Sequence, residues 1–241
     1  MSAGRCALSY YLAFFNGPNH LNLDYTGLLY NVPGKLAQLS SVRENTETIA
    51  GFVFASELLD HDYRDIRQQK DIVTGVYSGV GWEVPRLIED MWEAPDFYFD
   101  SISRIDMDHY STGRVVLLGD AGYGGTMGGI GTSLAMVGAY VLADELASAG
   151  VDHRVAFARY EDQIRAYSRG CQKLAEGAGP FLAPPTPKKI RRRNRALQIL
   201  SFKPLAGFFN RMTTKPASAI TLKDYQPVHT DAGQLLEEAD V

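Results

Sequence analysis

An acidic residue and the glycine-rich stretch after it are the residues of this sequence best suited to chemistry. Asp120 follows the apolar run 115–119, and glycines then stand at positions 122, 124, 125, 128, 129 and 131. A carboxylate at the end of a strand can accept hydrogen bonds from the hydroxyl groups of a sugar or sugar alcohol. Glycines let the main chain approach a ligand closely, and the first N–H groups of a helix suit a phosphate or an electron-rich ring edge. The pattern therefore predicts a cofactor site.

Two elements must position this stretch. Residues 115–119 are mostly apolar and predict a short buried strand. Apolar residues recur at helical spacing from Leu134 onward, so a helix is expected over 131–149, with Gly150 as the residue that ends it. The alternative interpretation is a tight connection from strand to helix that needs its glycines only for backbone geometry.

The N-terminal part predicts an antiparallel sheet, because short runs of aromatic and β-branched residues alternate with turn signals such as Pro33-Gly34. The expected strands are 6–15, 21–25, 27–32, 36–43 and 48–56. Two helices are expected between 57 and 95, and a further strand over 97–106. The aromatic side chains of this sheet are expected in the core, with a substrate pocket as the alternative place for some of them.

The C-terminal part predicts helices. One is expected from Asp152, which suits an N-cap, to about residue 176, followed by a break over 177–190. Residues 188–212 form a basic amphipathic segment, interpreted as a helix packed on the body with a charged end. The alternative is a helix that binds a membrane surface or an anionic partner. The polar, acidic tail 227–241 is expected to fray.

Composition narrows the class of protein. The 241 residues carry a formal net charge of −4, which argues against nucleic-acid binding by the chain as a whole. Two cysteines cannot form a disulfide framework or a cysteine-rich zinc site, so no metal is assigned and a cytoplasmic location is expected. No stretch reaches the roughly 18 apolar residues of a membrane-spanning helix, so no integral membrane segment is expected.

Four short stretches resemble a known family. They are GRVVLLGDAG at 113–122, GIGTSLA at 129–135, VGAYVLA at 137–143 and AFARYE at 156–161. Together they resemble the second flavin motif of the para-hydroxybenzoate-hydroxylase-like FAD monooxygenases, with strand, Gly-Asp pair, glycine loop and helix pair in the family's order. The segment before them resembles the family's substrate-domain sheet more loosely.

The resemblance implies a mixed α/β fold, in which an antiparallel substrate-domain sheet precedes the C-terminal part of an FAD-binding domain and long helices. Residues 1–106 would be the substrate-domain-like region with two helices. Residues 107–180 would contain the FAD-binding-like strand, the Gly-Asp loop and the helix pair. Residues 181–241 would form the C-terminal basic helix and tail.

The resemblance also implies the site. Asp120, after Gly119, would accept hydrogen bonds from the ribityl hydroxyls of FAD. The backbone beside the pyrimidine side of the flavin ring would be that of Gly128, Gly129, Ile130, Gly131 and Thr132, where a helix N-terminus stabilises negative charge. In that family NAD(P)H reduces FAD, and an oxygen atom from O₂ passes to the substrate. The implied enzyme is an oxidoreductase that hydroxylates a small aromatic or polyketide-like molecule. No catalytic residue is assigned, because no histidine or acid pair has a helpful spacing.

The sequence also departs from the family pattern. It has no G-x-G-x-x-G fingerprint and no middle Asp-Gly motif, so it resembles about the C-terminal two-thirds of a family member. Three interpretations stay open: a monooxygenase fragment completed by another chain or by oligomerisation, an incomplete flavoprotein-like binding module, or a loop for another nucleotide such as S-adenosylmethionine. In the first case, apolar faces of 115–118 and 134–142 would be uncovered and would favour association.

Overall fold

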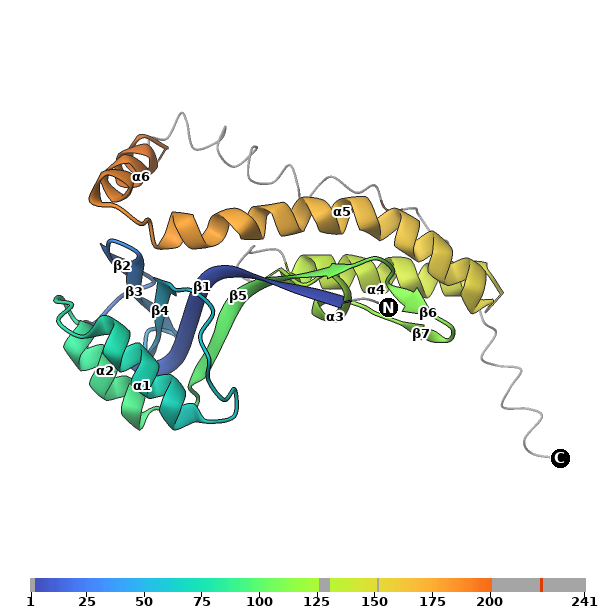
Figure 1. Cartoon of the computed structure of the whole chain (residues 1–241). Helices are drawn as coiled ribbons and strands as arrows, with labels where there is room; N and C mark the ends of the chain where they lie inside the picture. Colours follow the sequence, from blue (N-terminus) through green and yellow to red (C-terminus); the bar gives the residue numbers. More distant parts are fainter. Residues whose placement is uncertain (1–2, 126–130, 151, 201–221, 223–241) are drawn as a thin grey trace, which may run out of the picture.

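The structure, a computed structural model, describes residues 3–125, 131–150, 152–200 and 222 (Figure 1). Five strands form the main sheet: β1 (Ala3–Pro18), β2 (Gly27–Val32), β3 (Lys35–Val42), β4 (Glu47–Ala55) and β5 (Tyr98–Met107). A short hairpin consists of β6 (Ser111–Thr112) and β7 (Val115–Val116). The helices are α1 (Ile66–Tyr77), α2 (Val84–Glu93), α3 (Asp120–Tyr123), α4 (Gly131–Ser148), α5 (His153–Leu182) and α6 (Pro187–Leu200). The predicted mixed fold, an antiparallel sheet followed by long helices, is confirmed.

The main sheet has the order β2-β3-β4-β1-β5, and its neighbouring strands are antiparallel. Five of the six strands expected in residues 6–106 are present, but the strand expected over 21–25 is wrong. Asn19 Oδ1 accepts the N–H of Leu23 at 2.8 Å, and Asn45 Oδ1 accepts the N–H of Tyr25 at 2.8 Å. These side chains take the backbone donors that a strand would offer to its neighbour, so the segment becomes a turn.

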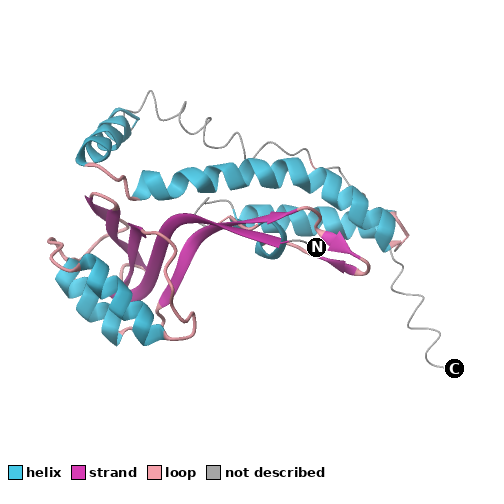
Figure 2. Ribbon diagram, viewed as in Figure 1, coloured by secondary structure: helices cyan, strands magenta, loops and turns pink. Residues whose placement is uncertain are grey.

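Helices α1 and α2 cover one face of the sheet, as Figure 2 shows. The aromatic side chains on that face are buried against apolar residues of the two helices. The core there includes Tyr11, Phe15, Phe52, Phe54, Val73, Leu87 and Met91. The Tyr77 hydroxyl lies 2.6 Å from the Leu36 carbonyl oxygen and 2.9 Å from that of Val53, which ties α1 to the sheet.

The other face of the sheet packs partly under the C-terminal end of α5. Ala183, just after this helix, is buried with Tyr10 and Leu12 of β1. The break expected from residue 177 is wrong, because α5 continues to Leu182 with Pro180 inside it. Gly179 lies so close to Tyr10 that a Cβ there would come within 2.5 Å of the ring. Tertiary packing therefore holds the last turns of α5 helical despite their glycines and proline.

Helices α4 and α5 pack side by side at the other end of the molecule (Figure 1). The interface buries Leu134 and Val141 of α4 against Tyr160 and Ile164 of α5. The predicted ends are confirmed: Gly150 has φ +58°, and the side chain of Asp152 accepts the N–H of Arg154 at 3.0 Å.

Helix α6 carries the basic segment as far as Leu200. The remainder of the segment predicted over 188–212, and the tail 227–241, lie outside the described residues. Among the described helices, none is both long enough and apolar enough to cross a membrane.

Candidate functional site

The strand expected before Asp120 is shorter and more exposed than its composition predicts. Only Val115–Val116 form β7, which pairs with β6. Val115 is 58% exposed and Leu118 is also exposed, so the prediction of a buried strand over 115–119 is wrong for this chain. The reason is that, among the described strands, β7 pairs with β6 in a separate two-stranded sheet and is not part of the main sheet.

The backbone turns sharply after this strand, and glycine permits the turn. Gly119 has φ +64° and ψ −140°, a conformation that L side chains rarely adopt, and Asp120 begins α3 directly after it. A Cβ on Gly124 would lie 2.8 Å from the Asp120 carbonyl oxygen. These contacts support the interpretation that the first glycines of the run are needed for the backbone geometry of a tight connection between strand and helix.

Asp120 and the start of α4 lie next to one another. The Asp120 side chain is exposed, and its Oδ1 lies 3.9 Å from the position that a Cβ on Gly131 would take. Among the described residues, no hydrogen-bond donor engages this carboxylate. Thr132 is exposed in the first turn of α4, where N–H groups have no partner within the helix. Gly128, Gly129 and Ile130 lie outside the described residues.

A buried tyrosine pair holds this turn on α5. The hydroxyl groups of Tyr123 and Tyr160 are 2.9 Å apart, and Tyr160 also donates to the Leu117 carbonyl oxygen at 3.0 Å. Burial, followed by the hydrogen bond with Tyr123, raises the pKa of Tyr160 well above its usual value, so the Tyr160 hydroxyl stays neutral. Tyr160 lies in the AFARYE stretch that carries the family resemblance, but no sequence signal pointed to its partner Tyr123 in the glycine loop.

Glu161 holds the residues that lead into the β6–β7 hairpin. Its carboxylate accepts the N–H of Tyr110 at 3.0 Å and also contacts His109 and Arg165. Burial alone would raise the pKa of Glu161, but the hydrogen bonds from Tyr110, Arg165 and His109 outweigh it and lower the pKa. The carboxylate is therefore charged at neutral pH, and it positions the chain without acting as a proton donor.

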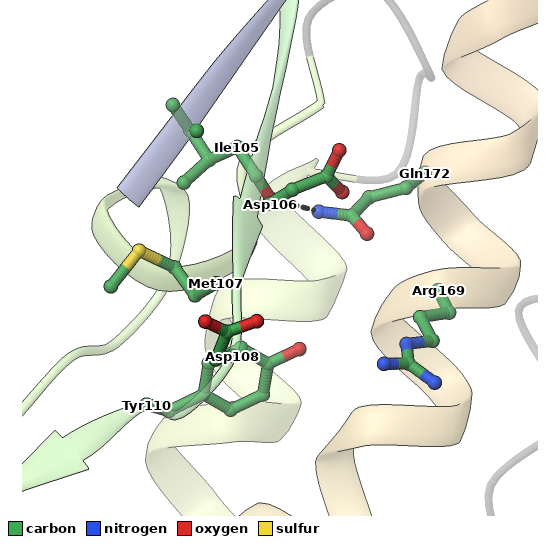
Figure 3. A pocket seen from close by; sticks show the side chains of 8 residues that line it. Ile105, Asp106, Met107, Asp108, Tyr110, Arg169 and Gln172 are labelled. Carbon is green, nitrogen blue, oxygen red and sulfur yellow. Dashed lines mark hydrogen bonds between the residues drawn. The ribbon is translucent and has the colours of Figure 1, made fainter. Parts of the chain in front are cut away.

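A polar cavity of about 380 Å³ lies between β5 and α5 (Figure 3). Figure 3 shows Arg169 and Gln172 pointing from α5 toward β5, and Gln172 Nε2 donates to the Ile105 carbonyl oxygen at 2.7 Å. Gln172 also lines a recess of about 10 Å³ next to Asp120. As formed by the described residues, that recess is too small for a ring.

The face of the sheet opposite α1 and α2 carries one continuous row of paired residues. The register places Leu29, Gln38, Gly51, Phe14 and Tyr98 side by side across all five strands. Leu29 is 56% and Tyr98 is 53% exposed. The Phe14 ring lies over Gly51, where a Cβ would come within 2.5 Å of it. The row presents a flat apolar surface with the Gln38 side chain in it.

The described residues offer no group of three or more His, Cys, Asp or Glu side chains that could hold a metal ion. What the site does offer is an exposed carboxylate, a helix N-terminus and an apolar sheet face. These groups can bind and orient a molecule with hydroxyl groups and a flat ring.

The comparisons with known proteins agree with one another, although no family model matches the chain. A flavin-dependent monooxygenase from an unknown prokaryotic organism is 42% identical over 161 residues, which are 66% of this chain and 42% of that protein. The crystal structure of tetracycline destructase Tet(55) is 35% identical, with a TM-score of 0.77 over 92% of this chain and 57% of that one.

The chain belongs to the FAD-dependent monooxygenase family. The structure of Klebsiella pneumoniae HpxO complexed with FAD and uric acid shares its fold at 19% identity, with a TM-score of 0.68 over 90% of this chain and 55% of that one. FAD is the cofactor of this family. The chain spans about half the length of the relatives that it matches.

Proposed function

We propose that this chain supplies the ring-side part of an FAD site and the substrate-binding sheet of a flavin-dependent monooxygenase. The observation that carries the proposal is the exposed Asp120 carboxylate beside the start of α4, in a chain of this family. The reaction would hydroxylate a small aromatic or polyketide-like molecule with NAD(P)H and O₂. When bound, FAD would supply the redox chemistry that activates O₂.

The residues near Asp120 fit the flavin in charge and shape. The carboxylate can accept hydrogen bonds from ribityl hydroxyls, and Gly131 leaves the neighbouring space free of side-chain atoms. The first N–H groups of α4, at Gly131 and Thr132, would stabilise negative charge on the reduced ring. Gly119 has a supporting role, because its backbone conformation places Asp120 at the start of α3. Gly128, Gly129 and Ile130 complete the proposed site.

The row of residues across the open sheet face supports the proposed substrate class. Phe14 and Leu29 offer flat apolar surface, and the Gln38 amide can donate to or accept from a hydroxyl or carbonyl group of the substrate. An apolar wall also keeps water away from reactive oxygen species at the site. The proposed role of this chain's residues is thus to bind, orient and exclude water.

A second role, as a subunit completed by another chain, is supported by the exposed apolar residues of the FAD-binding half. Val115, Leu118 and Met136 all expose apolar surface there.

The separate core clusters before and after residue 107 support the proposed division into 1–106, 107–180 and 181–241. The two free cysteines, Cys6 and Cys171, support the proposed cytoplasmic location.

The first test is an absorbance spectrum of the purified chain, alone and after gel filtration with added FAD. Retained flavin bands are expected, and Asp120→Asn should weaken FAD binding roughly tenfold, by the loss of charge-assisted hydrogen bonds worth about 1.5 kcal/mol. Asp71→Asn, on the exposed side of α1, is the matched control and should leave binding unchanged. No retained flavin with excess FAD would overturn FAD binding by this chain alone. NAD(P)H oxidation with candidate aromatics then tests the reaction.

A further inference from the structure

Helix α6 presents a stripe of basic side chains that the proposed oxidation does not use. The stripe consists of Lys188, Arg191, Arg192 and Arg195, which recur at helical spacing on one face. All four side chains are exposed, and none forms an ion pair with any residue that the structure describes. The helix contains no acidic residue, although the whole chain has a net charge of −4. Positive charge is therefore concentrated locally.

The opposite side of α6 is fastened to the protein by Arg193. Its guanidinium donates to the carbonyl oxygens of Phe181 at 2.8 Å and Leu182 at 3.1 Å, and to Asn31 Oδ1 at 2.7 Å. The same guanidinium lies 5.8 Å from the centre of the Phe181 ring. Because the Arg193 side chain reaches the body of the protein, the basic stripe on the opposite side of the helix faces solvent.

The stripe also contains apolar surface. Ala196 and Ile199 continue the same face toward the C-terminal end of α6, and Ile199 is 60% exposed. Basic residues combined with exposed apolar residues on one helix face are typical of helices that lie on an anionic bilayer. The helix has no aromatic side chain on which a nucleobase could stack, so this composition favours lipid over single-stranded nucleic acid.

We propose that the basic stripe of α6 docks the protein on a bilayer that contains anionic phospholipids. The lipid phosphates would pair with the four cations, and Ile199 would enter the interface between headgroups and acyl chains. Arg193 would keep the helix fastened to the body of the protein, so the whole domain would be carried to the membrane surface. This proposal is independent of FAD binding and of the proposed oxidation.

Co-sedimentation of the full chain with vesicles tests the proposal. Vesicles of phosphatidylcholine mixed with phosphatidylglycerol should bind the protein roughly tenfold or more tightly than pure phosphatidylcholine. Binding should disappear as the ionic strength approaches about 1 M, where the screening length falls to about 3 Å. Equal binding to both kinds of vesicle, or none to either, would overturn the proposal.

A charge-reversed pair of variants locates the effect. Arg191→Glu/Arg195→Glu should lower vesicle binding at least about tenfold, because each basic residue near an anionic lipid surface strengthens binding severalfold. Arg67→Glu/Arg86→Glu changes the net charge equally on exposed positions of α1 and α2 and should bind like the parent protein. An equal loss in both variants, or binding of the stripe to RNA without binding to vesicles, would contradict a lipid-specific surface. Circular dichroism checks that both variants are folded.

Discussion

The sheet region (residues 1–106) and the glycine-loop region (residues 107–180) differ in how completely their described parts bury apolar residues. One face of the sheet is covered by α1 and α2, and the end of α5 covers part of the other face around Tyr10 and Leu12. In the second region α4 buries Leu134 and Val141 against α5 but leaves Met136 69% exposed. The first region therefore has its own core, while the second has one covered and one uncovered side.

Different kinds of contact stabilise the two regions. The sequence predicts uncovered apolar faces at 115–118 and 134–142. Val115 and Leu118 are exposed, as predicted for the first face. On the helix over 134–142 the predicted apolar face is buried, and the opposite side of the helix is exposed. The sheet region is stabilised by burial of large side chains. The loop region is stabilised by close backbone approach and by hydrogen bonds between buried polar groups.

The largest effect is expected from breaking the sheet core. Phe52 is fully buried, and its ring centre lies 4.5 Å from that of Tyr77. Phe52→Ala should lower the free energy of unfolding by about 3–5 kcal/mol, through lost apolar burial and the cavity left behind. Urea denaturation measures this free energy. Leu29→Ala, on the exposed row of the same sheet, should change the free energy of unfolding by only about 0.5 kcal/mol. Similar losses in both variants would contradict a core on the helix-covered face.

A smaller effect is expected where α4 approaches the glycine loop. A Cβ on Gly138 would come within 2.1 Å of the Tyr123 hydroxyl oxygen, and that side chain is buried and bonded to Tyr160. Gly138→Ala should therefore destabilise the protein by about 1–3 kcal/mol despite the better helix propensity of alanine. In Gly170→Ala the new methyl group meets no atom within 4 Å, so a gain of about 0.5–1 kcal/mol is expected. Thermal unfolding of both variants decides whether close packing or helix propensity dominates.

The hydrogen bonds of Glu161 make the loop region sensitive to acid. The folded-state pKa lies below the unfolded value, so this carboxylate stabilises the fold above its unfolded pKa, and the contribution is lost as pH falls through the folded pKa. Glu161→Gln should cost about 1–2 kcal/mol at neutral pH, because the Tyr110 N–H and Arg165 lose a charged acceptor. The difference between variant and parent should shrink as the solution becomes acidic. A difference that does not change with pH would show that the charge is unimportant.

The smallest effect on folding is expected on the uncovered side of α4. Met136→Glu should change the free energy of unfolding by no more than about 0.5 kcal/mol, because the side chain is exposed. Sedimentation velocity should nevertheless show less self-association, since the apolar patch becomes charged. A parent chain that is a clean monomer at all concentrations would contradict the idea that this side needs to be covered.

Much of the fold could be predicted from local patterns. The strand 27–32 and the helix over 131–149 follow from residue periodicity, and Gly150 and Asp152 have the expected roles at helix ends. Two of the three errors have a common cause, and the third, the buried strand over 115–119, does not share it. The turn at 21–25 depends on side chains of Asn19 and Asn45, and the last turns of α5 depend on contact with Tyr10, more than 160 residues away in sequence.

The candidate site divides in the same way. A cofactor site is predicted from Asp120 and the glycine run, because strand end, acid and helix start are local features, whereas FAD is predicted only from the resemblance of these stretches to a known family. Its support could not be predicted, since Tyr123 meets Tyr160 and Gln172 meets Ile105 only when α5 folds back onto the loop and the sheet.

Local sequence patterns specify the periodicity of strands and helices, the helix ends and the position of the acidic residue beside the glycine loop. Each of these depends on residues within a few positions of one another. Only the tertiary structure decided that Gly138 is packed while Gly170 is open, and that Arg193, among neighbouring arginines, is the one that points inward. The physical reason is that burial and hydrogen bonding depend on partners distant in the chain, which local spacing does not specify.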